Sequence, residues 1–216
     1  MKLFAEHHGF WTERNKKSLY LGLALVLLSL FIQIRAGHYS AHTAASAHFV
    51  GDIFLDNLPV VDLDFMIVTA ALALWIFSVS LLAVKPRELL FGLKALALYT
   101  IFRAFFLSLT HVGIYPRQIT FDDSFGYNFY KLVTFQGNYF FSGHTGFPFL
   151  MMLIFWEDKL LRYFFLAMSI IFGATVLLAH VHYSIDVFAA PFIVYGIYRI
   201  AQMVFKEDYK ILNSHS

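Results

Sequence analysis

Six apolar runs with the character of membrane helices divide this chain of 216 residues. They lie at about 19–34, 65–84, 89–110, 146–156, 161–179 and 187–205, and they contain few or no charged side chains. A helix of about 20 apolar residues crosses a bilayer core about 30 Å thick. We therefore expect an all-α integral membrane protein whose six transmembrane helices form one bundle. The composition excludes an ordinary soluble domain, because only 14% of the residues are charged, against about 25% in soluble domains.

The predicted organisation has three parts. Residues 1–18 form a polar, basic arm, residues 19–206 form the six-span membrane domain, and residues 207–216 form a short tail. The arm mixes Leu, Phe and Trp with Lys, Arg and His, so it fits either an interfacial amphipathic helix or a polar tail that sets the topology. We interpret the first run as a retained anchor, since no small-residue cleavage signal follows it.

Basic side chains predict the orientation in the membrane. Twelve of the 16 Lys and Arg residues fall in the arm, in a turn that carries Lys85, Arg87 and Lys94, between the fourth and fifth runs, and near the C-terminus. Cytoplasmic segments of membrane proteins carry the excess of Lys and Arg, so these segments and both termini should be cytoplasmic. The small size favours a bacterial inner membrane protein, whose opposite face is the periplasm.

The tetrapeptide Ser142-Gly143-His144-Thr145 opens the fourth run. Ser142 fits a helix N-cap, and Gly143 allows a ligand to approach the backbone closely. The unpaired N–H groups of a helix N-terminus suit a phosphate, at which His144 would point. Ser142 and Gly143 are therefore candidate substrate-binding residues and His144 a candidate catalytic residue; the alternative is an ordinary capped helix with an interfacial His.

A second cluster, His180-Val-His182-Tyr-Ser-Ile-Asp186, follows the fifth run. His182 and Asp186 are four residues apart, so in a helical turn they share a face and the carboxylate can accept one imidazole N–H. An imidazole oriented in this way is a nucleophile or a general base. The alternative is an ion pair at a helix end without a catalytic role. An acidic side chain at the end of a membrane span costs free energy, however, unless it is paired or hydrated.

Three cations are candidates for holding an anionic substrate. Arg103 lies inside the third run, where a guanidinium needs an anion, and we favour the phosphate of a phosphodiester over a structural Asp. Arg117 and Lys131 lie in the second long external loop and are weaker candidates. All three are candidate substrate-binding residues, and the alternative for Arg117 and Lys131 is a solvated charge in the loop.

The sequence contains no signal for binding a metal ion, a cofactor or a nucleic acid. The chain has no Cys, and His38 and His42 have the spacing of two ligands on a helix without the neighbouring Glu of an HExxH arrangement. We therefore predict no metal, no cofactor and no nucleic-acid partner. Asp56 and Asp62, in the first external loop, fit either a bend before a capped helix or a site for a cationic headgroup.

Two motifs resemble those of a known family. Phe140-Phe-Ser-Gly-His144-Thr is similar to LFSGHT, and Leu177-Leu-Ala-His-Val-His182-Tyr-Ser-Ile-Asp186-Val is similar to LLAHxHYTxDV. Both motifs belong to the sphingomyelin synthase-like branch of the type 2 phosphatidic acid phosphatase (PAP2) superfamily of lipid phosphatases and phosphotransferases. Arg103 followed by Pro116 resembles a third family motif more loosely. The resemblance implies the six-helix bundle of that family.

The resemblance also implies a catalytic triad of His144, His182 and Asp186. His182, oriented by Asp186, would attack phosphorus and hold the phospho-headgroup. His144 would protonate the departing diacylglycerol oxygen and then deprotonate the acceptor hydroxyl. The implied reaction moves a phospho-headgroup from a membrane phospholipid to a lipid alcohol, ceramide or diacylglycerol, with ceramide favoured.

Departures from the superfamily's phosphatases favour transfer between lipids. Their Lys-x6-Arg-Pro motif is absent, and Val176 stands six residues before His182, where they usually carry Arg. A phosphomonoester dianion would meet too few cations, whereas a diester carries one charge. The first alternative is a lipid phosphatase or phospholipase-C-like hydrolase that uses the same triad, and the second is a non-catalytic lipid-binding or scaffold protein on this fold. Headgroup and oligomeric state are left open, and Gln136-Gly-Asn138 replaces the Cys-Gly-Asp typical of the branch.

Overall fold

The computed structural model of the chain describes residues 9–109, 111–121 and 140–214, and all regular structure in these ranges is helical. The elements are α2 (Glu13–Ala44), a π-helical turn η1 (Met66–Ala70) that continues into α3 (Ala71–Val84), α4 (Pro86–Leu107), α6 (Gly143–Ile154), α7 (Lys159–Leu178), α8 (Ser184–Val204) and α9 (Lys206–Leu212). The predicted all-α class is confirmed for these residues.

Local sequence signals account for several helix starts. Thr12 caps α2 by accepting a hydrogen bond from Asn15 N, and Asp158 caps α7 by accepting one from Leu161 N. Pro86 is the first residue of α4, a position where the missing N–H costs nothing and the fixed φ suits the helix.

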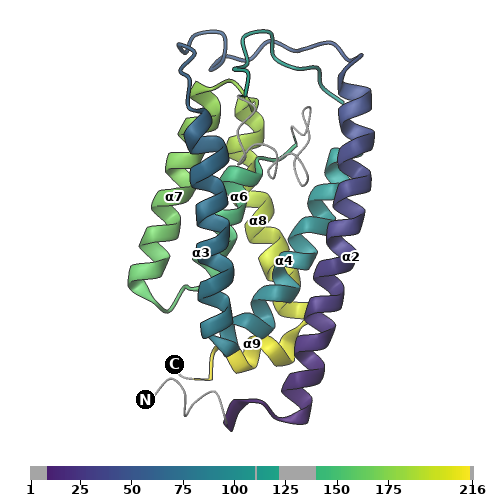
Figure 1. Cartoon of the computed structure of the whole chain (residues 1–216), viewed down its shortest axis with the longest axis vertical. Helices are drawn as coiled ribbons and strands as arrows, with labels where there is room; N and C mark the ends of the chain where they lie inside the picture. Colours follow the sequence, from purple (N-terminus) through teal and green to yellow (C-terminus); the bar gives the residue numbers. More distant parts are fainter. Residues whose placement is uncertain (1–8, 110, 122–139, 215–216) are drawn as a thin grey trace.

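The helices form an elongated bundle (Figure 1). In that view α2 runs along one side next to α4, while α3 and α7 lie on the other side. The end where α2 begins and α9 lies is called the terminal end, and the opposite end, with segments 45–65 and 111–121, is called the loop end. At the terminal end the Lys85 ammonium, between α3 and α4, lies 3.3 Å from the Asp158 carboxylate at the start of α7.

Within the described ranges, five helices are long and apolar enough to cross a membrane: α2, η1 with α3, α4, α7 and α8. These helices fit an integral multi-pass membrane protein. The fourth predicted run corresponds to α6, which has 12 residues and a length of about 18 Å at 1.5 Å per residue. That length is below the bilayer core of about 30 Å, so a sixth complete span stays a prediction.

Two sequence expectations about position are wrong. The first run was expected to end at about residue 34, but α2 continues to Ala44 and includes His38 and His42. The Ala-rich continuation contains no Pro, and Ala favours helix strongly. Lys94 was expected in a turn but lies within α4, almost fully buried.

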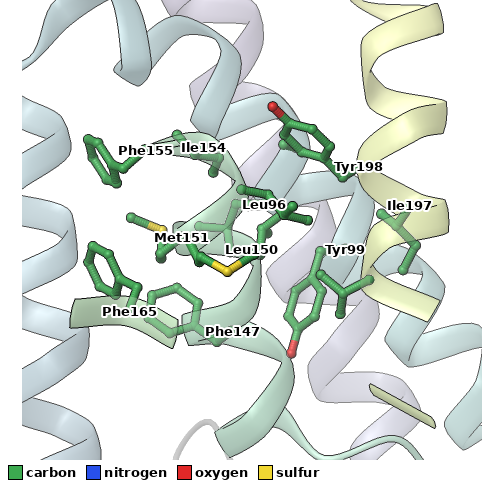
Figure 2. Packing of buried hydrophobic residues seen from close by; sticks show 14 of the residues in the cluster. Leu96, Tyr99, Phe147, Leu150, Met151, Ile154, Phe155, Phe165, Ile197 and Tyr198 are labelled. Carbon is green, nitrogen blue, oxygen red and sulfur yellow. The ribbon is translucent and has the colours of Figure 1, made fainter. Parts of the chain in front are cut away.

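The core lies around α6, in which nine of the 12 residues are buried. Figure 2 shows Leu150 and Met151 of α6 among side chains from α4, α7 and α8, such as Tyr99, Phe165 and Ile197. Ser169 Oγ of α7 also donates a hydrogen bond of 2.8 Å to the Thr145 carbonyl in the first turn of α6. The surrounding helices therefore fix the position of α6, and with it the tetrapeptide that opens it.

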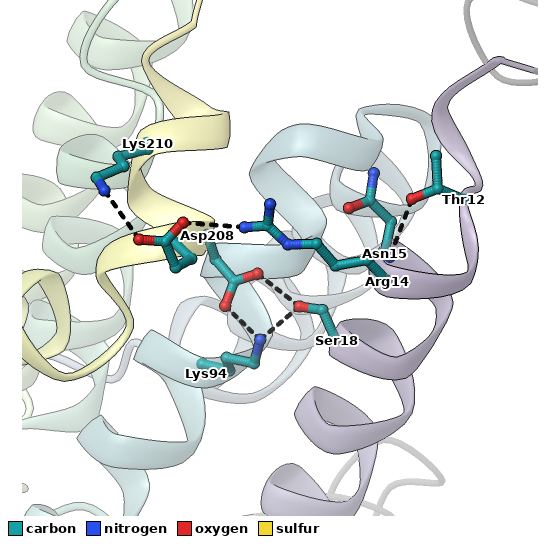
Figure 3. Close-up of polar contacts among 8 residues, drawn as sticks. Thr12, Arg14, Asn15, Ser18, Lys94, Asp208 and Lys210 are labelled. Atoms are coloured by element: carbon teal, nitrogen blue, oxygen red, sulfur yellow. Dashed lines mark hydrogen bonds and ion pairs between the residues drawn. The ribbon is translucent and has the colours of Figure 1, made fainter.

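Lys94 forms a polar cluster at the terminal end (Figure 3). Its ammonium pairs with the Asp208 carboxylate of α9 and donates to Ser18 Oγ of α2 at 2.5 Å. Ser18 Oγ in turn donates to Asp208 Oδ1 at 2.5 Å. Three helices that are distant in sequence, α2, α4 and α9, thus meet at one buried charge pair.

Gly113 lies where the two segments of the loop end touch. Its N–H donates to the His48 carbonyl at 3.0 Å, and a Cβ here would overlap the carbonyl oxygen of Ala47 and lie 2.8 Å from the carbonyl carbon of His48. We expect Gly113→Ala to force the segments apart and lower the free energy of unfolding by about 1–3 kcal/mol.

Thermal unfolding in detergent measures this effect. Gly196→Ala is the matched control, because a Cβ at position 196 meets nothing within 4 Å. A Gly113→Ala variant that melts at the wild-type temperature would contradict the expected clash.

Candidate active site

His182 and Asp186 form a buried pair at the start of α8. His182 Nδ1 lies 3.3 Å from Asp186 Oδ2, and both residues are nearly inaccessible to solvent. His182 precedes Tyr183, the N-cap of α8, so the pair spans the helix start rather than lying within one helix. Asp186 Oδ2 also accepts the Tyr183 N–H at 3.1 Å, and the carboxylate in the first turn suits the positive end of the helix.

The starts of α6 and α8 are joined directly. Ser142 N donates to the Asp186 carbonyl at 3.0 Å. Ser142 is the N-cap of α6, as predicted, because its Oγ accepts from Thr145 N at 3.4 Å. Two helix N-termini, each with a partial positive charge, therefore lie side by side.

His144 faces His182 across this junction. The centroids of the two rings are 6.3 Å apart, and His144 Nε2 lies 3.0 Å from the Ile67 carbonyl in η1. A carbonyl oxygen only accepts hydrogen bonds, so His144 Nε2 carries the hydrogen and Nδ1 is the nitrogen whose protonation can change. Short π-helical turns are frequent at functional sites, and this one holds a candidate catalytic side chain.

Arg103 approaches the same place from α4. Its Nε donates to the Phe141 carbonyl at 3.3 Å, and a Cβ at Gly143 would lie 3.5 Å from Nε. The absence of a side chain at Gly143 thus lets the guanidinium lie against the first turn of α6. The structure brings Arg103, Ser142, Gly143 and His144 together with the His182–Asp186 pair.

Arg117 binds the neighbouring loop. Its Nη2 donates to the carbonyls of Leu55 and Asp56 at 2.9 and 3.1 Å, and the side chain is exposed. These contacts join the two segments of the loop end, while a role of Arg117 in substrate binding stays a prediction. Lys131 lies outside the described residues.

Asp52 is a residue whose role sequence reasoning missed. Its Oδ2 accepts the backbone N–H of Ser184, the first residue of α8, at 2.7 Å. Burial raises the pKa of the Asp52 carboxyl, but the backbone N–H groups that donate to it outweigh burial and hold the pKa below its ordinary value. Asp52 therefore caps α8 from a distant loop, and no local sequence signal marks a contact across 132 positions.

The other loop carboxylates serve local structure. Asp56 Oδ2 accepts Asp52 N at 3.0 Å, and Asp56 Oδ1 accepts the Tyr115 hydroxyl at 2.7 Å. Asp62 Oδ1 accepts Asp64 N at 3.1 Å just before η1. Within the described part of the chain, no three His, Cys, Asp or Glu side chains gather in a group able to hold a metal ion.

A family model of known proteins matches part of the chain. Residues 137–203 match a family model described as PAP2 superfamily C-terminal, and this stretch includes His144, His182 and Asp186. No curated protein and no solved structure matches the chain. The match suggests a lipid enzyme of the phosphatase or phosphotransferase type, and it supports membership of this chain in the PAP2 superfamily.

Proposed function

We propose that the protein is a membrane phosphotransferase of the sphingomyelin synthase-like branch, which moves a phospho-headgroup from a glycerophospholipid to a lipid hydroxyl and releases diacylglycerol. Ceramide is the favoured acceptor. One observation carries the proposal: the His182–Asp186 pair faces His144 where two helix N-termini meet. A nucleophile with an orienting carboxylate and a second imidazole is the set of groups that double displacement requires.

The first step forms a phosphohistidine. Asp186 holds His182 through Nδ1, so Nε2 attacks phosphorus as the bond from phosphorus to the diacylglycerol oxygen breaks. His144 Nδ1 gives its proton to that oxygen. In the second step the acceptor hydroxyl returns a proton to His144 Nδ1, its oxygen attacks phosphorus, and the phosphorus–nitrogen bond breaks. Both steps need His144 to exchange one proton, as general acid and then as general base.

Local positive charge supports an anionic phosphodiester as the substrate. The Arg103 guanidinium and the N-terminus of α6 converge at Gly143, and N–H donors and guanidinium groups bind phosphate oxygens. We assign Arg103, Ser142 and Gly143 to phosphate binding in this mechanism. Among the described residues, the formal positive charge that reaches this junction comes from Arg103, so a second phosphate charge, as in a monoester, would have little further compensation.

The proposed orientation follows the distribution of basic side chains. Lys85, Lys159 and Lys206 lie at helix junctions of the terminal end, which we assign to the cytoplasmic side by the excess of positive charge. The termini are then cytoplasmic and the candidate active site lies toward the exoplasmic face, the periplasm of a bacterial inner membrane.

Hydrolysis is the second candidate function. The matched superfamily takes its name from phosphatases, and water in place of the lipid alcohol would release the phospho-headgroup from the same phosphohistidine. The two reactions share the first step and differ only in the acceptor.

Product analysis in liposomes distinguishes the two functions. Purified protein in vesicles of choline, ethanolamine and inositol phospholipids, with and without labelled ceramide, should produce diacylglycerol and a new ceramide phospho-headgroup lipid, identified by mass spectrometry. Which headgroup appears on ceramide identifies the donor. Diacylglycerol with free phospho-headgroup, unaffected by ceramide, would make the protein a hydrolase and overturn the transferase proposal.

A further inference from the structure

His180 is a buried histidine that the proposed mechanism does not use. It lies in the turn between α7 and α8, two residues before His182, with none of its surface exposed. Its φ of 57° makes it the one non-glycine residue with positive φ in the described ranges. A non-glycine residue with positive φ is uncommon and carries a steric cost, so the chain accepts some backbone strain here and keeps an imidazole.

The strained turn is closed by backbone hydrogen bonds. His180 N donates to the Leu177 carbonyl at 3.1 Å, and Val181 N donates to the Val176 carbonyl at 3.0 Å. This bonding ends α7 and reverses the chain within a few residues. The left-handed residue therefore determines the direction in which the next residues, His182 among them, leave the turn.

The His180 ring packs against the loop end. Its centroid lies 5.3 Å from that of Tyr115, edge to face, and Tyr115 also packs against Tyr183 at 6.1 Å. The Tyr115 hydroxyl donates to Asp56. Neither nitrogen of the His180 ring makes a hydrogen bond of ordinary geometry to the described residues. The ring thus acts through its shape, as a filler between Tyr115 and the turn.

The surroundings of His180 favour the neutral imidazole. Burial lowers the pKa of His180 and the Arg117 guanidinium lowers it further, while the backbone of Leu58 and the charge of Asp52 oppose the shift. A neutral ring avoids the cost of burying an unpaired charge and so suits a packing role at this buried position.

We infer that His180 is a positioning residue for the proposed reaction: its left-handed backbone and its buried ring set the α7–α8 turn so that His182 meets Asp186 and faces His144. The inference rests on the proposed nucleophilic role of His182. It does not depend on the acceptor, because diacylglycerol release is common to transfer and hydrolysis.

Three substitutions separate the backbone contribution from that of the ring. His180→Asn keeps a residue that tolerates positive φ, His180→Gly removes the strain and the ring, and His180→Ala removes the ring while the strain remains. We expect kcat for diacylglycerol release, per folded enzyme, to fall least in the Asn variant, about 10-fold in the Gly variant and about 100-fold in the Ala variant. KM should change little, because Arg103 and the start of α6 are untouched.

A merely structural role would produce a different pattern. It would lower the yield or the melting temperature while kcat per folded enzyme stayed within about twofold of wild type in all three variants. That result, or a loss confined to KM, would overturn the inference. If His182→Ala, measured in parallel, kept wild-type kcat, the proposed function itself would fail, so the two failures are distinguishable.

The pH dependence of stability gives a second readout. A folded-state pKa below the ordinary imidazole value of about 6.5 means that the unfolded chain binds a proton first as pH falls. His180 therefore makes wild-type stability fall between about pH 6.5 and its lower folded pKa. The His180→Asn variant should show a shallower fall in melting temperature over this range, and an identical fall would contradict a neutral, buried His180.

Discussion

Replacing His182 with Ala should lower kcat for diacylglycerol release by about 10^4-fold or more, as removal of the nucleophile does in covalent catalysis. The imidazole is held at Nδ1 by Asp186 at 3.3 Å, and no other described side chain combines a nucleophile with an orienting carboxylate at this junction. Melting temperature should change much less than activity. The measurement is the rate of diacylglycerol release in vesicles, corrected for folded protein.

Two further variants make this test specific. Asp186→Asn keeps an acceptor for the Tyr183 N–H but presents an amide to His182. The amide no longer holds the His182 imidazole in the reactive tautomer, so kcat should fall about 10^4-fold. Ile185→Ala changes an exposed side chain that lies between His182 and Asp186 in the sequence, and this variant should retain wild-type kcat. Activity of His182→Ala within about tenfold of wild type would exclude His182 as the nucleophile.

Replacing Lys94 with Met should cause the largest loss of stability, about 3–5 kcal/mol, because it leaves the buried Asp208 carboxylate without its ion pair. Lys94 is 2% exposed, and its other partner, Ser18, offers a hydroxyl but no charge. The double substitution Lys94→Met with Asp208→Leu should recover most of the loss, since two apolar side chains often replace a buried ion pair without cost. Denaturant or thermal unfolding in detergent measures both variants.

An exposed pair in the same region provides the control. Arg14 Nη2 lies 3.1 Å from Glu207 Oε2, and both side chains are exposed to solvent. Such surface ion pairs contribute little to stability, so the Arg14→Gln variant should melt close to the wild-type temperature. Because the cluster lies at the terminal end, away from the candidate active site, kcat per folded Lys94→Met enzyme should stay near wild type. Equal stability of Lys94→Met and Arg14→Gln would contradict the account of this cluster.

Much of the fold could be predicted because apolar runs and helix caps are local. The second, third, fifth and sixth runs match η1 with α3, α4, α7 and α8 to within a few residues. The end of α2 was missed because the polar, Ala-rich segment after residue 34 no longer looks like membrane helix yet still favours helix. The burial of Lys94 was missed because its partner, Asp208, lies 114 positions away.

The same difference between local and long-range contacts decides which parts of the candidate site could be predicted. The Ser142 cap and the contact between His182 and Asp186 follow from spacings of three and four residues, so the sequence predicts them. Short spacings cannot predict contacts between residues that are distant in sequence. Two such contacts shape the site: the Ile67 carbonyl lies against His144, and Asp52 accepts a hydrogen bond from the start of α8. Arg117 could be recognised as a cation, but its carbonyl partners could not.

The most direct test of the central claim is to trap the intermediate. Enzyme in vesicles of phosphate-labelled phospholipid without acceptor is quenched within one turnover, digested under alkaline conditions and mapped by mass spectrometry. We predict an acid-labile phospho-headgroup on His182, absent in His182→Ala and discharged when ceramide is added before the quench. A burst of diacylglycerol with no label on the protein, or with label on another residue, would contradict the proposed mechanism.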